Sequence, residues 1–197
     1  MKNKIIFTVL IIILGLLLTM TFTNEVNAQK RTATKRTTVK RTTTTKVVRV
    51  PRSKVTYKKP RAKVVATRSI PNKRVVVSPR GVNYYYANNR FYRSYNGRYI
   101  AVAPKVGLRI GFLPNGYRTI VFAGRNYFYF DGIYYDQIGD EYEVVYPELG
   151  TIIYELPDEY EKVEYDGQLL YEANGVLYER VQVDGTRAYE VVGIVED

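Results

Sequence analysis

The feature that most constrains this fold is a segment that recurs three times at a spacing of 43 residues. Leu-Pro-Asn-Gly-Tyr at 113–117 returns as Leu-Pro-Asp-Glu-Tyr at 156–160, and more weakly upstream as Ile-Pro-Asn at 70–72. The same offset carries Gly-Val-Asn-Tyr-Tyr-Tyr at 81–86 onto Gly-Arg-Asn-Tyr-Phe-Tyr at 124–129. Repeats of this length stack as copies of one supersecondary unit. The sequence therefore predicts a repeat domain over 70–197, with copies at about 70–112, 113–155 and 156–197.

Only the third copy departs from this register. Four residues are inserted around Asp184-Gly185, so that Tyr-Glu-Val-Val at 142–145 matches Tyr-Glu-Val-Val at 189–192.

Turn chemistry within each copy is that of β-hairpins. Asn88-Asn89, Asp131-Gly132 and Asn174-Gly175 lie between aromatic runs, and Asp166-Gly167 is a further candidate. These residue types tolerate the positive φ of two-residue turns. Around the turns, β-branched and aromatic residues alternate with polar ones, as in half-buried strands. We expect an all-β fold: an antiparallel meander of short strands, four or five per copy, forming a small sandwich or barrel-like domain.

The N-terminus has the order of a signal peptide. Lys2 and Lys4 precede an apolar run over 5–18, and small residues lead to Ala28, which predicts cleavage between Ala28 and Gln29. An uncleaved anchor is the alternative, but the run is shorter than the roughly 20 residues that span a bilayer. We expect an exported protein without a transmembrane span after cleavage, in the periplasm, at the outer-membrane surface or outside the cell.

Charge is strongly segregated along the chain. Residues 29–123 hold 24 Lys and Arg and no Asp or Glu, whereas residues 124–197 hold 4 basic and 18 acidic residues. Residues 29–69 combine this charge with abundant Thr and few aromatic residues, so they cannot bury enough apolar surface to offset chain entropy. We expect them to be extended and disordered, between the signal peptide (1–28) and the repeat domain (70–197).

The basic segment is a candidate polyanion-binding site. Multivalent cations bind lipid headgroups, phosphorylated polymers or nucleic acid without sequence specificity, and the alternative is a solvated spacer. The candidate residues are Lys30, Arg31, Lys35, Arg36, Lys40, Arg41, Lys58 and Lys59. The expected partner is an anionic envelope polymer or lipid, with no specific nucleic acid. Two further alternatives remain open: self-association of the basic half with the acidic half of another molecule, and folding back of the basic half on the acidic repeats of its own chain.

The tyrosines are a second candidate site. Tyr offers a ring face and a hydroxyl, which suits stacking on sugars or polymers, but such rings more often pack between strands. The candidate platform comprises Tyr84, Tyr85, Tyr86, Tyr92, Tyr127, Tyr129, Tyr134 and Tyr135.

The chain has few of the residue types that usually serve catalysis or bind metal ions. The chain has no Cys and no His, which excludes disulfides, thiolate ligands and a Cys nucleophile. Carboxylate pairs such as Asp158 with Glu161, or Glu141 with Glu143, could in principle serve a glycoside hydrolase. No loop has calcium-ligand spacing. We therefore predict no catalytic, cofactor-binding or metal-binding residue and no enzymatic activity.

The pattern Leu-Pro-x-Gly-Tyr, Gly-x-x-Tyr-Tyr-Tyr, Gly-x-Tyr-Tyr and Gly-Tyr-x-Val-Val-x-Pro resembles an uncharacterised family of secreted bacterial proteins, known only as a domain of unknown function. Residues 113–147 match most closely, although Glu141-Tyr142 replaces Gly-Tyr. The resemblance implies an exported β-rich protein and carries no functional residues. We expect a structural or interaction protein of the cell envelope. The alternatives are a carbohydrate-binding module, a self-assembling matrix protein or, least favoured, a glycoside hydrolase.

Overall fold

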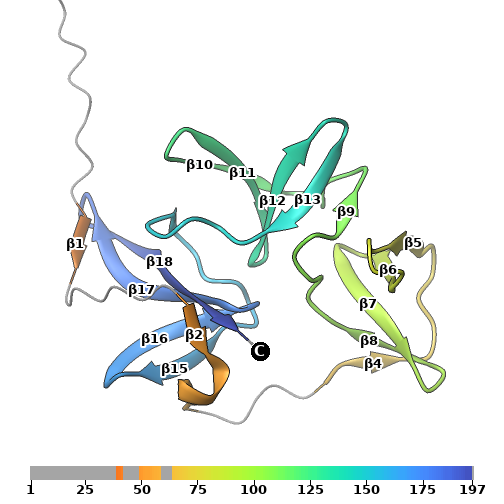
Figure 1. The fold of residues 1–197 in the computed structure, drawn as a ribbon, viewed down its shortest axis with the longest axis horizontal. Helices are drawn as coiled ribbons and strands as arrows, with labels where there is room; N and C mark the ends of the chain where they lie inside the picture. Colours follow the sequence, from red (N-terminus) through yellow and green to blue (C-terminus); the bar gives the residue numbers. More distant parts are fainter. Residues whose placement is uncertain (1–38, 42–48, 59–63, 197) are drawn as a thin grey trace, which may run out of the picture. The chain divides into compact units, whose positions relative to one another are not determined.

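A computed structural model describes residues 39–41, 49–58 and 64–196 (Figure 1), and for 39–41 only the backbone. The predicted signal peptide and its cleavage site at Ala28 and Gln29 lie outside these residues. Within the described part, the regular elements are β-strands and one short 3-10 helix, η1 (Arg52–Lys54). This confirms the all-β, mainly antiparallel fold. No helix long and apolar enough to cross a membrane occurs among the described residues.

The strands form three sheets. The first sheet contains β4 (Ala66–Thr67), β5 (Arg74–Val77), β6 (Asn83–Ala87), β7 (Arg90–Tyr95) and β8 (Arg98–Ala101), in the order β4-β8-β7-β6-β5. The second contains β9 (Arg109–Ile110), β10 (Arg118–Phe122), β11 (Arg125–Phe130), β12 (Ile133–Ile138) and β13 (Glu141–Val145), in the order β10-β11-β12-β13-β9. The third contains β14 (Ile152–Ile153), β15 (Glu161–Tyr165), β16 (Gln168–Ala173), β17 (Val176–Val183) and β18 (Thr186–Glu196).

Three strands from the basic segment join the third sheet. They are β1 (Val39–Arg41), β2 (Arg49–Pro51) and β3 (Thr56–Tyr57). The β3 strand pairs with β15, so the sheet has the order β14-β18-β17-β16-β15-β3, while β1 pairs with β17 and β2 with β18.

Strand pairing in the three sheets follows one register. A two-residue strand pairs with the last strand of each hairpin series, β4 with β8, β9 with β13 and β14 with β18. The equivalent residue pairs are Ala66 with Ile100, Arg109 with Glu143 and Ile152 with Glu190. These positions differ by 43 residues, and by 47 at the last strand because of the insertion. Each short strand precedes its Pro-containing loop, so the second and third sheets begin before residues 113 and 156.

The predicted hairpin turns form as the residue types require. Asn88-Asn89, Asp131-Gly132, Asp166-Gly167 and Asn174-Gly175 each have positive φ at both residues and join consecutive strands. Two positive φ values in a two-residue turn match the right-handed twist of antiparallel strands. These four turn predictions are confirmed.

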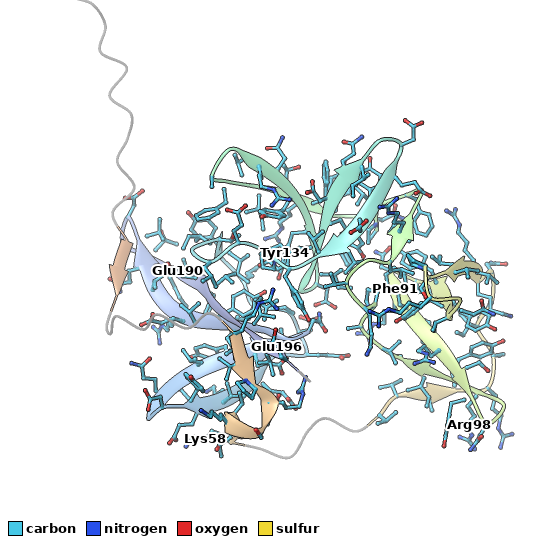
Figure 2. All side chains as sticks on the ribbon, in the orientation of Figure 1. Lys58, Phe91, Arg98, Tyr134, Glu190 and Glu196 are labelled. Atoms are coloured by element: carbon cyan, nitrogen blue, oxygen red, sulfur yellow. The ribbon has the colours of Figure 1, made fainter. Side chains whose placement is uncertain are left out.

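Packing between the sheets uses two faces, which we call face a and face b. In the first sheet, face a carries Tyr84, Tyr86 and Phe91, and face b carries Tyr85 and Tyr92. Figure 2 labels Phe91. Face a of the first sheet packs on face b of the second sheet in one apolar cluster. Face a of the second sheet packs on face b of the third sheet in another. The middle sheet is thus buried on both sides.

Face a of the third sheet is covered by the basic segment. Val50 and Val55 bury against Val163, Leu170 and Leu177 in a separate cluster, and Val50 is 0% exposed. We call residues 49–58 the N-terminal cap. The expectation of disorder over 29–69 is therefore wrong for these residues. Their strands β2 and β3 pair with the third sheet, and the few apolar side chains between the cations are enough to pack on it. Residues 29–38, 42–48 and 59–63 lie outside the described part.

The four-residue insertion lengthens one hairpin. Val181, Gln182 and Val183 extend β17 beyond the other copies and pair with β1. At its C-terminal end, β18 pairs in parallel with β2 through Ile194 and Val195. The longer third copy thus supplies the edges on which the basic segment docks.

The Leu-Pro motif links each sheet to the hairpin of the preceding one. The backbone N–H of Asn115 donates to the side-chain oxygen of Asn89 at 3.1 Å. The equivalent N–H of Asp158, 43 residues later, donates to the Asp131 carboxylate at 3.2 Å. In the second and third sheets, this loop therefore contacts the hairpin of the sheet before it.

Candidate functional site

The first sheet and the loops around it carry a group of exposed cations, which we call the first-sheet cations. They have no ion-pair partner among the described residues. They are Arg68, Lys73, Arg74, Arg80, Arg93, Arg98 and Lys105. Arg98 lies at a hairpin turn of this sheet (Figure 2). No Asp or Glu occurs between residue 64 and Asp131, so a carboxylate partner would have to come from a later segment, as it does for Arg90.

Two of these cations lie over aromatic rings. The Lys73 ammonium lies 5.2 Å from the centre of the Tyr99 ring, and the Arg74 guanidinium 4.8 Å from that of Phe112. A cation over a ring face is attracted by the ring's quadrupole. Local ring contacts, rather than carboxylates, therefore position these two side chains.

Six other cations of the described chain, one of them in β7 of the first sheet, meet carboxylates of other segments. Such pairs are Arg49 with Glu196 (2.5 Å), Arg90 with Glu159 (3.0 Å), Arg109 with Glu143 (2.7 Å), Arg118 with Glu155 (3.0 Å), and Lys58 with Glu164. Arg125 meets both Asp136 (2.5 Å) and Glu148 (3.1 Å), and these hydrogen bonds raise its pKa. Exposed pairs each contribute only about 0–1 kcal/mol. Their main effect here is to neutralise part of the basic half within the same chain.

The predicted polyanion-binding residues fall mostly outside the described part. Lys30, Arg31, Lys35, Arg36 and Lys59 are among the residues not described, and the side chains of Lys40 and Arg41 in β1 are likewise undescribed. Lys58 is exposed in the N-terminal cap and pairs with Glu164. The first-sheet cations were not among the candidates, although the absence of acidic residues up to residue 123 pointed to them.

Most of the predicted tyrosine platform is core. Six of the eight rings are at most 9% exposed, so they cannot stack on a ligand: Tyr84, Tyr86, Tyr127, Tyr129, Tyr134 and Tyr135. Burial raises the pKa of Tyr129, Tyr134 and Tyr135 well above 10. Only Tyr85 and Tyr92 remain half-exposed, on face b of the first sheet.

The carboxylate pairs considered for hydrolysis lie at the surface. Glu143 is held by Arg109, and Asp158 is exposed in the turn that docks on Asp131. Among the described residues, no group of three or more His, Cys, Asp or Glu side chains is placed to hold a metal ion.

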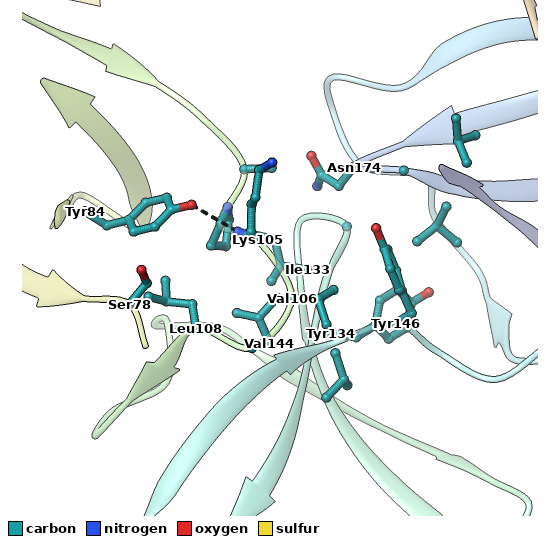
Figure 3. Close-up of a pocket in the computed structure, with 18 of the residues that line it drawn as sticks. Ser78, Tyr84, Lys105, Val106, Leu108, Ile133, Tyr134, Val144, Tyr146 and Asn174 are labelled. Atoms are coloured by element: carbon teal, nitrogen blue, oxygen red, sulfur yellow. Dashed lines mark hydrogen bonds between the residues drawn. The ribbon is translucent and has the colours of Figure 1, made fainter. Parts of the chain in front are cut away.

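A cavity of about 830 Å³ opens among the loops of the three sheets. Its lining includes the cations Arg52, Arg80, Arg93 and Lys105 and the carboxylates Glu159, Glu161 and Glu172. Figure 3 shows Tyr84 and Lys105 on one side and Tyr146 and Asn174 across from them, with Val144 between. The Tyr84 hydroxyl accepts the backbone N–H of Lys105 at 3.4 Å. Glu172 accepts the Gly175 N–H at 2.7 Å, so this carboxylate is committed to a turn.

Comparison with known protein families identifies a match to a family of unknown function. The profile of DUF6515, described as a family of unknown function, matches residues 54–195. No curated protein and no solved structure matches the chain significantly.

Proposed function

The chain belongs to DUF6515, a family of unknown function, and we propose that it acts as an exported interaction protein of the cell envelope. In this proposal, its cationic half binds anionic envelope polymers or lipid headgroups. The stacked sheets serve as the rigid module that presents the cations. The protein works by binding and has no catalytic activity.

The observation that supports this proposal most is the contrast between paired and unpaired cations. In the second sheet, Arg118 and Arg125 pair with carboxylates. In the first sheet, Arg93 and Arg98 are exposed without such partners among the described residues. A surface that concentrates one sign of charge attracts polyanions and raises their association rate. The segment 29–38, which the structure does not describe, adds Lys30, Arg31, Lys35 and Arg36 to the basic half.

Rigidity of the module follows from its buried faces. The middle sheet contributes Tyr127, Tyr134 and Tyr135, all at most 1% exposed, to the clusters on its two sides. Close-packed interiors of this kind hold their surface groups in a fixed arrangement. Cations held on fixed strands lose less conformational freedom on binding than those of a flexible chain.

Export is tested by the mature N-terminus. The chain is expressed in full, the cells are fractionated, and the intact mass is measured. The proposal predicts a mature protein that begins at Gln29 and is found outside the cytoplasm. Full-length protein in the cytoplasm contradicts export.

Binding is tested with two matched sets of charge changes. Mature protein is titrated with phosphatidylglycerol vesicles, phosphatidylcholine vesicles and lipopolysaccharide over a series of salt concentrations. Changing Arg93 and Arg98 to Gln removes unpaired cations, whereas the control changes Arg118 and Arg125 to Gln and removes paired ones. In a third variant Gln replaces the six cations Lys30, Arg31, Lys35, Arg36, Lys40 and Arg41, which leaves the N-terminal cap intact.

The expected outcome is salt-sensitive binding to the anionic probes only. For a phosphate polymer, the slope of log K against log salt falls by roughly 0.7 to 0.9 for each phosphate that the protein no longer neutralises. The Arg93/Arg98 variant and the six-residue variant each reduce this slope, and the Arg118/Arg125 control changes it less. Equal binding to neutral and anionic vesicles, or equal loss in both arginine pairs, contradicts the proposal. Salt-insensitive binding to a neutral glycan would instead favour a tyrosine-based carbohydrate site.

A further inference from the structure

Face b is a sheet-packing surface in two of the three sheets. Its central ring is Tyr135 in the second sheet and Tyr178 in the third, and both are 0% exposed because a neighbouring sheet covers them. The equivalent ring in the first sheet is Tyr92, 43 residues before Tyr135. Tyr92 keeps the residue type of a buried position but is only half-buried.

The same ring pair flanks this position in all three sheets. Tyr85 and Tyr99 meet edge to face with centres 5.0 Å apart and planes at 79°. The equivalent pairs are Phe128 with Tyr142 (5.3 Å, 82°) and Tyr171 with Tyr189 (5.4 Å, 79°). Face b of the first sheet is therefore built like the two faces that are covered.

Among the described residues, no other sheet packs on face b of the first sheet. Val75 and Val77, which are paired with Tyr85 and Asn83, are 58% and 57% exposed. The segments that the structure does not describe are poor candidates to cover it, since 29–38, 42–48 and 59–63 consist mainly of Thr, Lys and Arg. An apolar surface of this kind in an otherwise charged chain indicates a binding partner.

The chemistry of the face favours a second sheet over an anionic polymer. Its positions on β6, β7 and β8 are Asn83, Tyr85, Ala87, Arg90, Tyr92, Ser94, Tyr99 and Ala101. Arg90 is paired with Glu159, and Lys73 lies over the Tyr99 ring. The other first-sheet cations lie on other strands, on loops or on face a, so a polyanion on face b would meet few cations.

We propose that face b of the first sheet is the interface of a symmetric homodimer, in which it packs on the same face of a second copy. The other end of the stack is closed, because the N-terminal cap covers face a of the third sheet and buries Val50 completely. A head-to-tail filament would require the removal of this cap. A two-fold contact uses one patch twice and closes on itself, so association stops at the dimer.

The dimer goes beyond the proposed function, and its dependence on salt concentration distinguishes it from polyanion binding. The first-sheet cations of the two copies repel each other across the interface, so added salt screens the repulsion and strengthens the dimer. Salt weakens polyanion binding. Either behaviour can therefore fail without the other.

A single introduced cysteine tests the geometry, because the chain has no Cys of its own. Ser94, exposed on face b beside Tyr92, is changed to Cys in the mature protein. Ser53, exposed in the N-terminal cap, is changed to Cys in a matched control. The dimer predicts that a short bis-maleimide cross-links S94C to itself and not S53C to itself. A mixture in which S94C cross-links mainly to S53C shows head-to-tail stacking and overturns the symmetric interface.

Mass in solution tests the interface energetically. Sedimentation of the mature protein is expected to show a dimer that is favoured at high salt. Tyr92→Glu places a charge at the centre of the face and is expected to weaken the dimer by about 100-fold or more, because an unpaired charge would be buried. Tyr95→Glu, on the opposite face and 65% exposed, is the control and leaves the dimer unchanged. Circular dichroism confirms that both variants fold.

Three outcomes overturn the inference. One is a mature protein that stays monomeric at high salt and high concentration. Another is an equal effect of the Tyr92 and Tyr95 changes on the mass. The third is a folded Tyr92→Glu variant that remains dimeric.

Discussion

The hydroxyls of Tyr134 and Tyr178 form a side-chain hydrogen bond between two buried partners. Their oxygens lie 3.1 Å apart, between the second and third sheets. The two side chains are 1% and 0% exposed. Changing either to Phe removes one hydroxyl and leaves the other buried without its partner, whereas changing both removes the pair.

The expected magnitudes follow from that asymmetry. A buried polar group without a partner costs about 1–3 kcal/mol, while replacing both partners by apolar groups can be nearly neutral. We therefore expect Tyr134→Phe and Tyr178→Phe each to cost about 2 kcal/mol, and the double change to cost about 1 kcal/mol or less. For a domain of this size, each single change should lower Tm by roughly 4–8 °C.

Urea unfolding followed by circular dichroism measures all four proteins of this double-mutant cycle. Tyr135→Phe is the matched control, because Tyr135 is 0% exposed and its hydroxyl has no partner among the described residues. Removal of that hydroxyl should raise stability or leave it unchanged. The reasoning is refuted if the two single changes add up in the double variant, or if Tyr135→Phe costs as much as Tyr134→Phe.

Two further predictions concern the tyrosine core and the linked hairpins. Burial raises the pKa of four tyrosines above the ordinary 10.0: Tyr129, Tyr134, Tyr135 and Tyr178. The free energy of unfolding should therefore keep its full value below pH about 10 and fall at higher pH. The slope approaches about 1.4 kcal/mol per pH unit for each such tyrosine, and tyrosinate absorbance should rise together with loss of circular dichroism; gradual ionisation of these rings at pH 10 in a folded protein contradicts this. Gly132→Ala should destabilise the protein more than Gly124→Ala, although both glycines have φ near +80°. An added Cβ at Gly132 would lie 2.7 Å from side-chain atoms of Pro157 and Asn174, whereas no atom lies within 4 Å of a Cβ added at Gly124. The positive φ alone costs about 1–2 kcal/mol, and equal unfolding free energies for the two variants, measured in urea, would exclude a steric role for the Pro157 contact.

Local chemistry made the strands and turns predictable. Turn pairs such as Asn88-Asn89 and Asp131-Gly132 determine their own backbone geometry, and the fixed offset relates the pairing of one sheet to that of the next. Which face of a strand is buried is not encoded locally in this chain. Tyr84, Tyr85 and Tyr86 are consecutive and of one type, yet two are buried and one is half-exposed. Because both faces are aromatic, only the stacking order of the sheets decides.

The docking of the basic segment was not predictable from composition. Val50 and Val55 stand among cations, and nothing near them in sequence offers an apolar surface. Their partners Leu170, Leu177 and Val195 are more than one hundred residues away. The same distance hides the ion pairs: Arg49 and Glu196 are 147 positions apart. Charge segregation favoured contact between the basic and acidic halves, but the sequence did not decide whether that contact forms within one chain or between two.

The N-terminal cap has a consequence for the order of folding. It precedes all three repeats in the chain, yet it packs on the last strand, β18, through Ile194 and Val195. Contacts between such distant segments form slowly, because a long loop must close first. Because synthesis starts at the N-terminus, Val50 emerges from the ribosome early but becomes buried late. The cap can complete its packing only after β18 has emerged, so its burial waits for the synthesis of the third sheet.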